Sequence, residues 1–301
     1  MKQLFYRVIY HPTLNFLFRH CNKLAVSLVP CSIKLPPSGL LQIRDGKSRR
    51  IWLHTNQTNY LTHLLFWEGG AMQFEYTDIF VRLIRKVEGF YDIGANIGYY
   101  SLLAASENAQ ITIVGFEPAA GPLYYFRKNV NTNNFHNIRI EDIALADTKG
   151  ELTFYELRNK KYRYLKHNLA GESNAAGGYG GKNFVAVKVK STTLDEYVET
   201  YHDSVGLLKM DTEGTEHLIL QKATRTIASQ KPIIICETLF NTIEAELEQQ
   251  MKAHGYLFFN HVEGGLKAVE TIRRTSDDGV RNCFFVHPDK LDLIKEFIIN
   301  E

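Results

Sequence analysis

The sequence predicts an α/β protein with a largely parallel sheet and helices on both faces of that sheet. From about residue 75 onward, short apolar runs alternate with segments whose apolar residues recur at helical spacing. Strands that alternate with helices in this rhythm form parallel sheets through crossover connections. The chain has 301 residues, 45% hydrophobic and 23% charged, which is enough for one large domain with an appendage.

Charge balance and cysteine spacing argue against two classes of protein. Lys and Arg number 35 against 33 Asp and Glu, so no overall positive field favours nucleic acid, and we expect no nucleic-acid partner. The four cysteines form no C-x-x-C pair, which argues against a zinc site, and we expect no metal. Cysteines in this pattern fit a reduced compartment, so the sequence favours a cytoplasmic location.

Residues 1–74 are predicted to form an N-terminal extension that contains an amphipathic helix and a hairpin. Residues 1–30 carry apolar side chains at helical spacing, interrupted by Pro12 and several basic residues. Their longest uncharged segment, residues 24–33, is far shorter than the roughly 20 residues that span a bilayer. Two interpretations stay open: the helix packs on the domain, or it contacts a membrane surface peripherally.

Turn residues and apolar spacing predict the next elements. Residues 40–54 contain alternating apolar positions with Asp45-Gly46 at their centre, which predicts the hairpin. Residues 77–89 place apolar side chains on one helical face and end at Gly89, so they predict a helix that leads into the main domain, residues 75–301.

Within the main domain, apolar periodicity predicts the elements of a doubly wound sheet. Residues 184–201 predict a strand followed by a helix that Thr193 caps. The glycine-rich segment 168–183 predicts a long loop, either a connector or a lid. Late strands are expected near 256–260 and 283–288. The remaining strands are expected over 90–94, 111–117, 138–145, 151–157, 205–210 and 232–237, and helices over 97–106, 120–133, 215–229 and 243–255.

The first strand of the domain ends in a glycine-rich turn, FYDIGANIGYYS. Gly94 and Gly98 let the backbone approach a ligand closely, and the start of the following helix offers free N–H groups. A dinucleotide-binding turn carries its middle glycine where this chain has Asn96, which disfavours an NAD-dependent oxidoreductase. Asp92 at the turn and Glu117 at the end of the second strand favour a ligand with a cationic group and a ribose diol.

Together these motifs resemble the FkbM family of S-adenosylmethionine-dependent methyltransferases. The resemblance runs in order through FYDIGANIGYYS, GFEP, ALAD, TLDEY, LKMDTEGTEHLIL and IIICE, between about residues 75 and 240. It implies the Rossmann-like class I methyltransferase fold, with a seven-stranded, mostly parallel sheet and helices on both faces. It also implies S-adenosyl-L-methionine as the cofactor. The implied reaction is methyl transfer to a hydroxyl oxygen of a sugar, a glycan or a secondary metabolite.

The same resemblance implies which residues contact the cofactor. Glu117 is expected to bind the ribose hydroxyls, and Asp142, at the end of the third strand, is expected to contact the adenine. A surface carboxylate without a ligand is the other interpretation of Asp142. The methionine part is expected to be lined by residues of the glycine-rich turn, namely Asp92, Gly94, Asn96 and Gly98.

Three carboxylates at strand ends are the candidates for catalysis. Asp211 and Glu213 follow the strand at 205–210, and Glu237 ends the strand at 232–237. An alcohol acceptor reacts faster when a base removes its proton, and we predict Asp211 as that base, with Glu213 and Glu237 beside it. Neighbouring acids raise one another's pKa, and they equally suit a divalent cation. Glu216 is expected to stabilise the start of a helix.

Two other functions stay open on the sequence alone. A metal-assisted hydrolase could use Asp211, Glu213 and Glu237, and it would lose activity or stability with a chelator. A non-catalytic adenosyl-binding module would bind the cofactor without turnover, but it leaves the acidic residues without a purpose. The leading prediction is an O-methyltransferase whose partner is a small-molecule or glycan acceptor.

Overall fold

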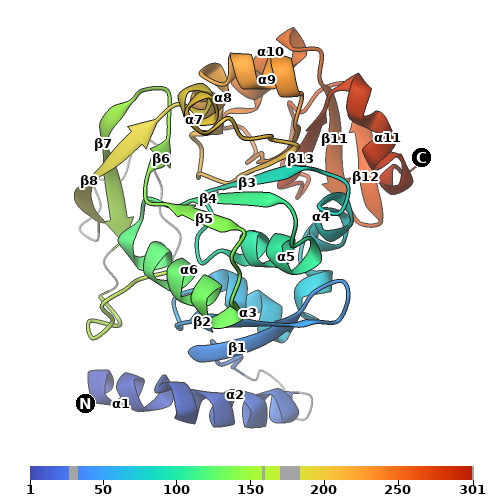
Figure 1. Ribbon diagram of the computed structural model, residues 1–301. Coiled ribbons are helices and arrows are strands. Elements are labelled where there is room, and N and C mark those ends of the chain that lie inside the picture. Colours follow the sequence, from blue (N-terminus) through green and yellow to red (C-terminus); the bar gives the residue numbers. More distant parts are fainter. Residues whose placement is uncertain (27–32, 158–159, 170–183, 300–301) are drawn as a thin grey trace.

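The structure is a computed structural model that describes residues 1–26, 33–157, 160–169 and 184–299. Its central sheet contains eight strands and lies in the middle of the molecule (Figure 1). These strands are β3 (Gly89–Ile93), β4 (Thr112–Phe116), β5 (Ile138–Glu141), β9 (Leu207–Met210), β10 (Ile233–Glu237), β11 (Leu257–Val262), β12 (Gly265–Val269) and β13 (Asn282–Val286).

The strand order confirms the predicted doubly wound architecture. Across the sheet the order is β12-β11-β13-β10-β9-β3-β4-β5. The five strands from β10 to β5 are parallel, and β13, β11 and β12 add antiparallel pairs. The expected number of seven is therefore wrong by one, because β12 extends the sheet by pairing with β11 at the edge. β4 pairs with one edge of β3 and β9 with the other, so the strand order reverses at β3. In such a sheet the ligand crevice is expected at the carboxyl ends of the strands at this point.

Helices cover both faces of the central sheet and enclose two apolar cores. One core contains Phe90 of β3 and Ile113 of β4, and the other contains their neighbours Tyr91 and Val114, because successive side chains of a strand point to opposite faces. The first face carries α4 (Thr77–Leu83), α5 (Tyr99–Glu107) and α6 (Ala120–Asn133), and the second carries α7 (Leu194–Tyr201), α8 (Glu216–Gln221), α9 (Thr224–Gln230) and α10 (Glu244–Ala253). After β13 follow η2 (Pro288–Lys290), α11 (Leu291–Ile294) and η3 (Lys295–Phe297).

A separate three-stranded sheet flanks the β5 side of the molecule. It contains β6 (Ala144–Leu145), β7 (Gly150–Leu157) and β8 (Phe184–Thr192) in the order β6-β8-β7. The single strand expected over 138–145 is therefore wrong. Its first half pairs with β4 as β5, and its second half turns away and pairs with β8 as β6.

The helix expected over 215–229 is also divided in two. The carboxylate of Asp195, on α7, accepts hydrogen bonds from the backbone N–H groups of Arg225 (3.0 Å) and Thr226 (2.8 Å). These contacts satisfy the first donors of α9 and so favour a new helix start. The Thr193 cap of α7 is confirmed, since its side chain accepts a hydrogen bond from the backbone of Glu196. Of the predicted glycine-rich loop, residues 170–183 lie outside the described residues.

The N-terminal region begins with two helices, and the predicted hairpin is confirmed by the pairing of β1 with β2. Its elements are α1 (Lys2–Ile9), α2 (Pro12–Val26), β1 (Gly39–Arg44), β2 (Arg50–Thr55), α3 (Tyr60–Trp67) and η1 (Ala71–Gln73). Asn129 and Asn133 of α6 accept hydrogen bonds from the backbone N–H groups of His54 and Trp52, so they occupy the outer edge of β2. No helix in the described ranges is long and apolar enough to cross a membrane.

Candidate active site

The glycine-rich turn brings the ends of β3 and β9 into direct contact. Gly94 follows β3 and has a φ of 72°, a conformation that L-residues with a side chain rarely adopt. A Cβ atom at this position would lie 1.9 Å from the backbone oxygen of Asp211. The turn can therefore approach the end of β9 only because residue 94 has no side chain.

Glu117 is held in one orientation by the backbone around it. Its carboxylate accepts a hydrogen bond from the backbone N–H of Asn96 (2.8 Å) and another from the backbone N–H of Ala119 (2.9 Å). Burial raises the pKa of Glu117 to about 7, although these two hydrogen bonds oppose the rise. The carboxylate has about four acceptor positions, so two remain for a ligand.

Asn96 connects the turn to the N-terminal region. It adopts a φ of 50°, and its side-chain oxygen accepts hydrogen bonds from the backbone N–H of Ile97 (2.9 Å) and the side chain of Asn59 (3.3 Å). An asparagine tolerates this left-handed conformation better than most residues. The residue that replaces the middle glycine of a dinucleotide-binding turn thus fixes the turn by its side chain.

Asp92 and Gly98 fix the turn through contacts inside the protein. The buried carboxylate of Asp92 accepts hydrogen bonds from the backbone N–H (3.1 Å) and the hydroxyl (2.7 Å) of Ser101 in the first turn of α5. Gly98 precedes α5 with a φ of 83°, and a Cβ atom there would lie 2.1 Å from the ring of Phe126. Both residues therefore position the backbone of the turn, and their predicted contact with the cofactor stays a prediction.

A cavity of about 300 Å³ lies between this turn and the three-stranded sheet, at the carboxyl ends of β3, β4 and β9. It has the size of a small-molecule site. The opposite wall comes from β6 and β7 and is mainly apolar, with Leu145, Leu152 and Phe154. Of the predicted site residues, the cavity is lined by Gly94, Asn96, Glu117, Asp211 and Glu213.

Four predicted site residues lie outside this lining: Asp92, Gly98, Asp142 and Glu237. Asp142 is exposed and forms an ion pair with Arg127 at 3.2 Å. Its neighbour Ile143 lines the cavity. The predicted adenine contact of Asp142 thus stays a prediction, and the structure places an apolar side chain closer to the cavity.

The loop after β9 carries the first two catalytic candidates. Asp211 lines the cavity with its side chain 45% exposed, so its carboxylate is accessible to a substrate. Glu213 has a φ of 58° and lines the same cavity. Burial, and then repulsion from Asp211 and Glu216, raises the pKa of Glu213 to about 7. The repulsion predicted between neighbouring acids thus acts on Glu213.

Glu216 shapes this loop from inside the protein. It is the first residue of α8, as expected, but its side chain is buried. One carboxylate oxygen accepts hydrogen bonds from the backbone N–H (2.5 Å) and hydroxyl (2.9 Å) of Thr212. The other accepts one from the backbone N–H of Gly214 (3.1 Å). Glu216 thus fixes the backbone between Asp211 and α8.

Lys209, which we did not predict as a site residue, contacts the carboxylates of Asp92 and Asp211 from inside the protein. Its buried Nζ donates a hydrogen bond to the backbone oxygen of Gly94 (2.8 Å) and lies 3.6 Å from Asp92 and 3.5 Å from Asp211. Burial alone lowers the pKa of Lys209, but the carboxylates of Asp211 and Asp92 outweigh this effect and the pKa is raised. A lysine inside the apolar strand 205–210 was the signal that could have revealed this role.

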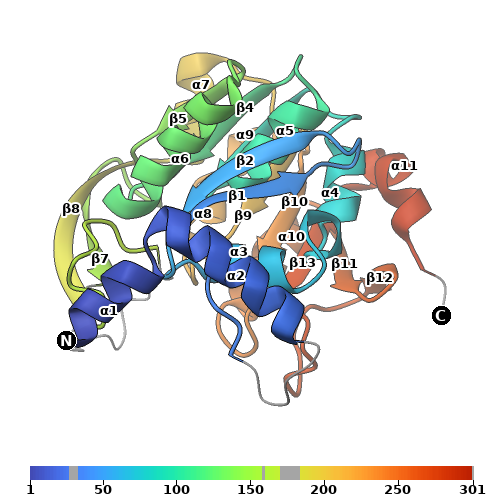
Figure 2. The ribbon, with the colours of Figure 1, turned by 90° about the horizontal axis from the view of Figure 1, so that it is seen from below.

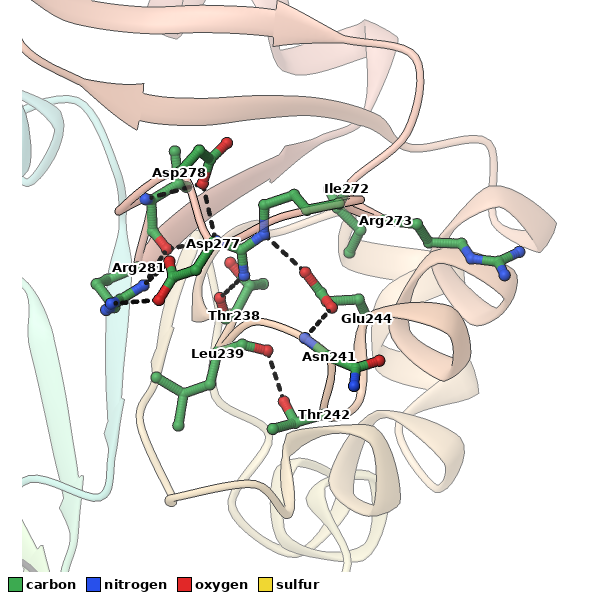
Figure 3. Close-up of polar contacts among 12 residues, drawn as sticks. Thr238, Leu239, Asn241, Thr242, Glu244, Ile272, Arg273, Asp277, Asp278 and Arg281 are labelled. Atoms are coloured by element: carbon green, nitrogen blue, oxygen red, sulfur yellow. Dashed lines mark hydrogen bonds and ion pairs between the residues drawn. The ribbon is translucent and has the colours of Figure 1, made fainter.

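Glu237 ends β10, next to β9 in the sheet. The loop that follows is held by Arg274, which donates hydrogen bonds to the backbone oxygen of Thr238 (2.5 Å) and to Glu244 (2.7 Å). Glu244 in turn accepts a hydrogen bond from the backbone of Asn241 (2.6 Å), as Figure 3 shows. This network fixes the end of β10 and so the position of Glu237.

The titration of Glu237 is expected to reduce stability at alkaline pH. Burial, and then repulsion from Asp211, raises the pKa of Glu237 to about 9. A raised carboxyl pKa favours the folded state at low pH, and this contribution is lost as the pH rises from about 4.5 through 9. Replacement by neutral Gln should therefore leave stability unchanged at pH 5 and increase it at pH 9 by on the order of 1–2 kcal/mol.

Urea unfolding of wild type and Glu237→Gln at both pH values measures this difference. Glu263→Gln, at an exposed turn outside the cavity lining, is the matched control and should follow the wild type. If Glu237→Gln also followed the wild type at pH 9, the raised pKa of Glu237 would be refuted.

The sheet order and the acid-ended strands around the cavity define the Rossmann-like class I methyltransferase fold. Residues 92–258 match the methyltransferase FkbM domain family, which is more than half of the chain. The chain belongs to this family of methyltransferases, and the predicted resemblance is confirmed.

Individual relatives are distant. The 31-O-demethyl-FK506 methyltransferase FkbM of Streptomyces tacrolimicus is 26% identical over 178 residues, which cover 50% of this chain and 68% of that protein. Methyltransferase 1 of Beauveria bassiana is 24% identical over 169 residues, which cover 50% of this chain and 66% of that protein. A solved FkbM methyltransferase from Methylobacillus flagellatus has a TM-score of 0.41 and 15% identity, covering 67% of this chain and 44% of that chain. The chain thus spans about two thirds of its curated relatives.

Proposed function

We propose that the protein transfers a methyl group from S-adenosyl-L-methionine to a hydroxyl oxygen of a small-molecule or glycan acceptor. One observation carries the proposal. A single cavity brings the carboxylate of Glu117, at the end of β4, together with Asp211 and Glu213, at the end of β9. Glu117 is placed to accept hydrogen bonds from a ribose, and Asp211 and Glu213 are placed to remove a proton beside it.

The residues present fit this cofactor. Glu117 has two hydrogen bonds from the backbone and two acceptor positions left for the ribose hydroxyls. Gly94 and Asn96 would hold the amino-acid part through the closely packed turn. The apolar wall with Leu145 and Phe154 would pack against the flat adenine.

The bound cofactor supplies a methyl group on a positively charged sulfur. The chain holds the acceptor in line with that group, which is the main contribution to such a displacement. Asp211 accepts the proton of the acceptor hydroxyl, and Lys209 fixes the orientation of Asp211 from below. Glu213, with its pKa raised to about 7, keeps a second proton acceptor at the same cavity near neutral pH.

Transfer to oxygen is supported by the name of one relative, which describes the Streptomyces tacrolimicus protein as acting on an O-demethyl compound. The metal-assisted hydrolase gains no support. Within the part of the chain that the structure describes, no three His, Cys, Asp or Glu side chains are placed to hold a metal ion. The proposed function also accounts for the acids at the cavity, which a pure binding module would not need.

Calorimetric titration with S-adenosyl-L-methionine tests the proposal directly. We expect binding of one ligand per chain with a dissociation constant in the micromolar range typical of enzyme ligands. Incubation with hydroxyl-bearing acceptors should then release S-adenosylhomocysteine. Absence of binding up to millimolar ligand would refute the cofactor, and binding without methyl transfer to any hydroxyl acceptor would favour a binding module.

A further inference from the structure

Exposed apolar side chains are concentrated on the two N-terminal helices. Figures 1 and 2 show α1 and α2 lying end to end along the outside of the molecule, next to the hairpin β1–β2. The exposed fraction of these apolar side chains ranges from 44% to 76%. They are Leu4, Phe5 and Val8 on α1, and Phe16, Leu17, Phe18 and Leu24 on α2.

The inner side of α2 is polar. Asn15 and Arg19 are the two buried residues of this helix, with exposed fractions of 0% and 1%. Asn15 accepts a hydrogen bond from the backbone N–H of Ser38 (2.7 Å), and Arg19 donates to the backbone oxygens of Ser38 (3.1 Å) and Leu40 (2.6 Å). A surface helix of a globular protein normally places its apolar side inward. The reversed arrangement leaves an apolar side facing outward.

The same region carries basic but no acidic side chains. The first acidic residue of the chain is Asp45, and six Lys and Arg residues precede it. Of these, Lys2, Arg7, Arg19 and Lys23 lie on α1 and α2, and all but the buried Arg19 are exposed. A second copy of the chain on this surface would bring the same positive charges together without acidic partners, whereas anionic lipid headgroups would complement them.

We propose that α1 and α2 form a membrane-docking surface that lies in the interface of a bilayer containing anionic lipid. The exposed apolar side chains enter the boundary between headgroups and acyl chains, and the basic side chains contact the headgroups. The chain would lie on the membrane rather than cross it, since no described helix can span one. This surface lies outside the cavity lining, so its role is independent of the proposed methyl transfer.

Flotation with vesicles tests the proposal without any measurement of activity. The full chain is mixed with vesicles of phosphatidylcholine containing roughly one third phosphatidylserine, and with vesicles of phosphatidylcholine alone. We expect the wild type to float with the anionic vesicles, to bind the neutral vesicles more weakly, and to dissociate in about 1 M salt, where charge attraction is screened. Equal binding to neutral vesicles would overturn the role of charge.

A triple variant tests whether vesicle binding depends on this surface or on nonspecific adsorption of the protein. Leu4→Gln, Phe5→Gln and Leu17→Gln together should lower binding to anionic vesicles by tenfold or more, on the order expected for the apolar area removed. These changes leave the polar inner face intact, so circular dichroism should show an unchanged fold. Leu257→Gln, at an exposed apolar position on β11, is the control and should bind as the wild type does.

Three further results would contradict the proposal. One is failure of the wild type to float with the anionic vesicles. Another is undiminished vesicle binding by the triple variant. The third is a wild-type dimer in sedimentation that the triple variant abolishes, since this would assign the surface to a second copy of the chain.

Discussion

Replacing Asp211 by Asn is expected to lower kcat about 10²–10⁴-fold, the usual contribution of a general base. The affinity for S-adenosyl-L-methionine should change by less than about threefold, because the proposed cofactor contacts come from other residues. The substitution keeps the shape of the side chain and removes the oxygen that takes the proton. Turnover is measured as S-adenosylhomocysteine formed with the acceptor that the wild type methylates, and binding is measured by calorimetry.

Asp292→Asn is the matched control, because the side chain of Asp292 is 91% exposed on α11, far in the sequence from every site residue. It should keep both kcat and affinity. A fully active Asp211→Asn variant would show that Asp211 is not the base. The double variant Asp211→Asn, Glu213→Gln would then decide whether Glu213 takes the proton.

Replacing Glu117 by Gln is expected to weaken cofactor binding by roughly 10–100-fold, since hydrogen bonds to a charged group contribute about 1.5–3 kcal/mol each. In the wild type the backbone N–H groups of Asn96 and Ala119 each donate to a different carboxylate oxygen, whereas Gln has one oxygen. One of these donors would face the NH₂ group of Gln. Calorimetry measures the loss of affinity, and thermal unfolding verifies that the variant is folded.

The pH dependence gives a second measurement on the same variant. The pKa of Glu117 is raised to about 7 in the free protein, and ribose hydroxyls donate to its ionised form. Wild-type affinity should therefore rise between pH 6 and pH 8, as the proton leaves. Glu117→Gln should lack this rise, whereas Glu263→Gln should retain it. A pH rise that persists in Glu117→Gln would assign the proton to another group.

Much of the fold follows from periodicity and strand ends. The alternation of apolar runs with helical segments predicts β3, β4, β9 and β10, and the acids that end these strands predict the edge where the cavity lies. Local pattern does not reveal pairing partners that are distant in the chain. Residues 138–145 read as one apolar strand, yet β6 turns away because Ser191 and Thr192 of β8, more than 40 residues after their partners, pair with it.

The parts of the site that sequence reasoning missed are buried polar side chains. Lys209 donates to the backbone oxygen of Gly94, 115 residues away in the chain. Glu216 was predicted only as a helix start, and its buried contact with the backbone of Thr212, four residues earlier, was missed. The spacing of Lys209 and Gly94 in the sequence carries no sign of their contact, since it depends on how two strands meet in the sheet.

The polar inner face of α2 has a consequence for how this helix is attached. Asn15 and Arg19 hold it to the backbone near residues 38–40 by hydrogen bonds. The helix also covers the buried ring of Phe66, which Arg19 and Lys23 contact from above its face. Detachment would therefore leave two buried polar side chains and an aromatic ring in need of new partners, so α2 is attached through specific polar contacts rather than through an apolar seam.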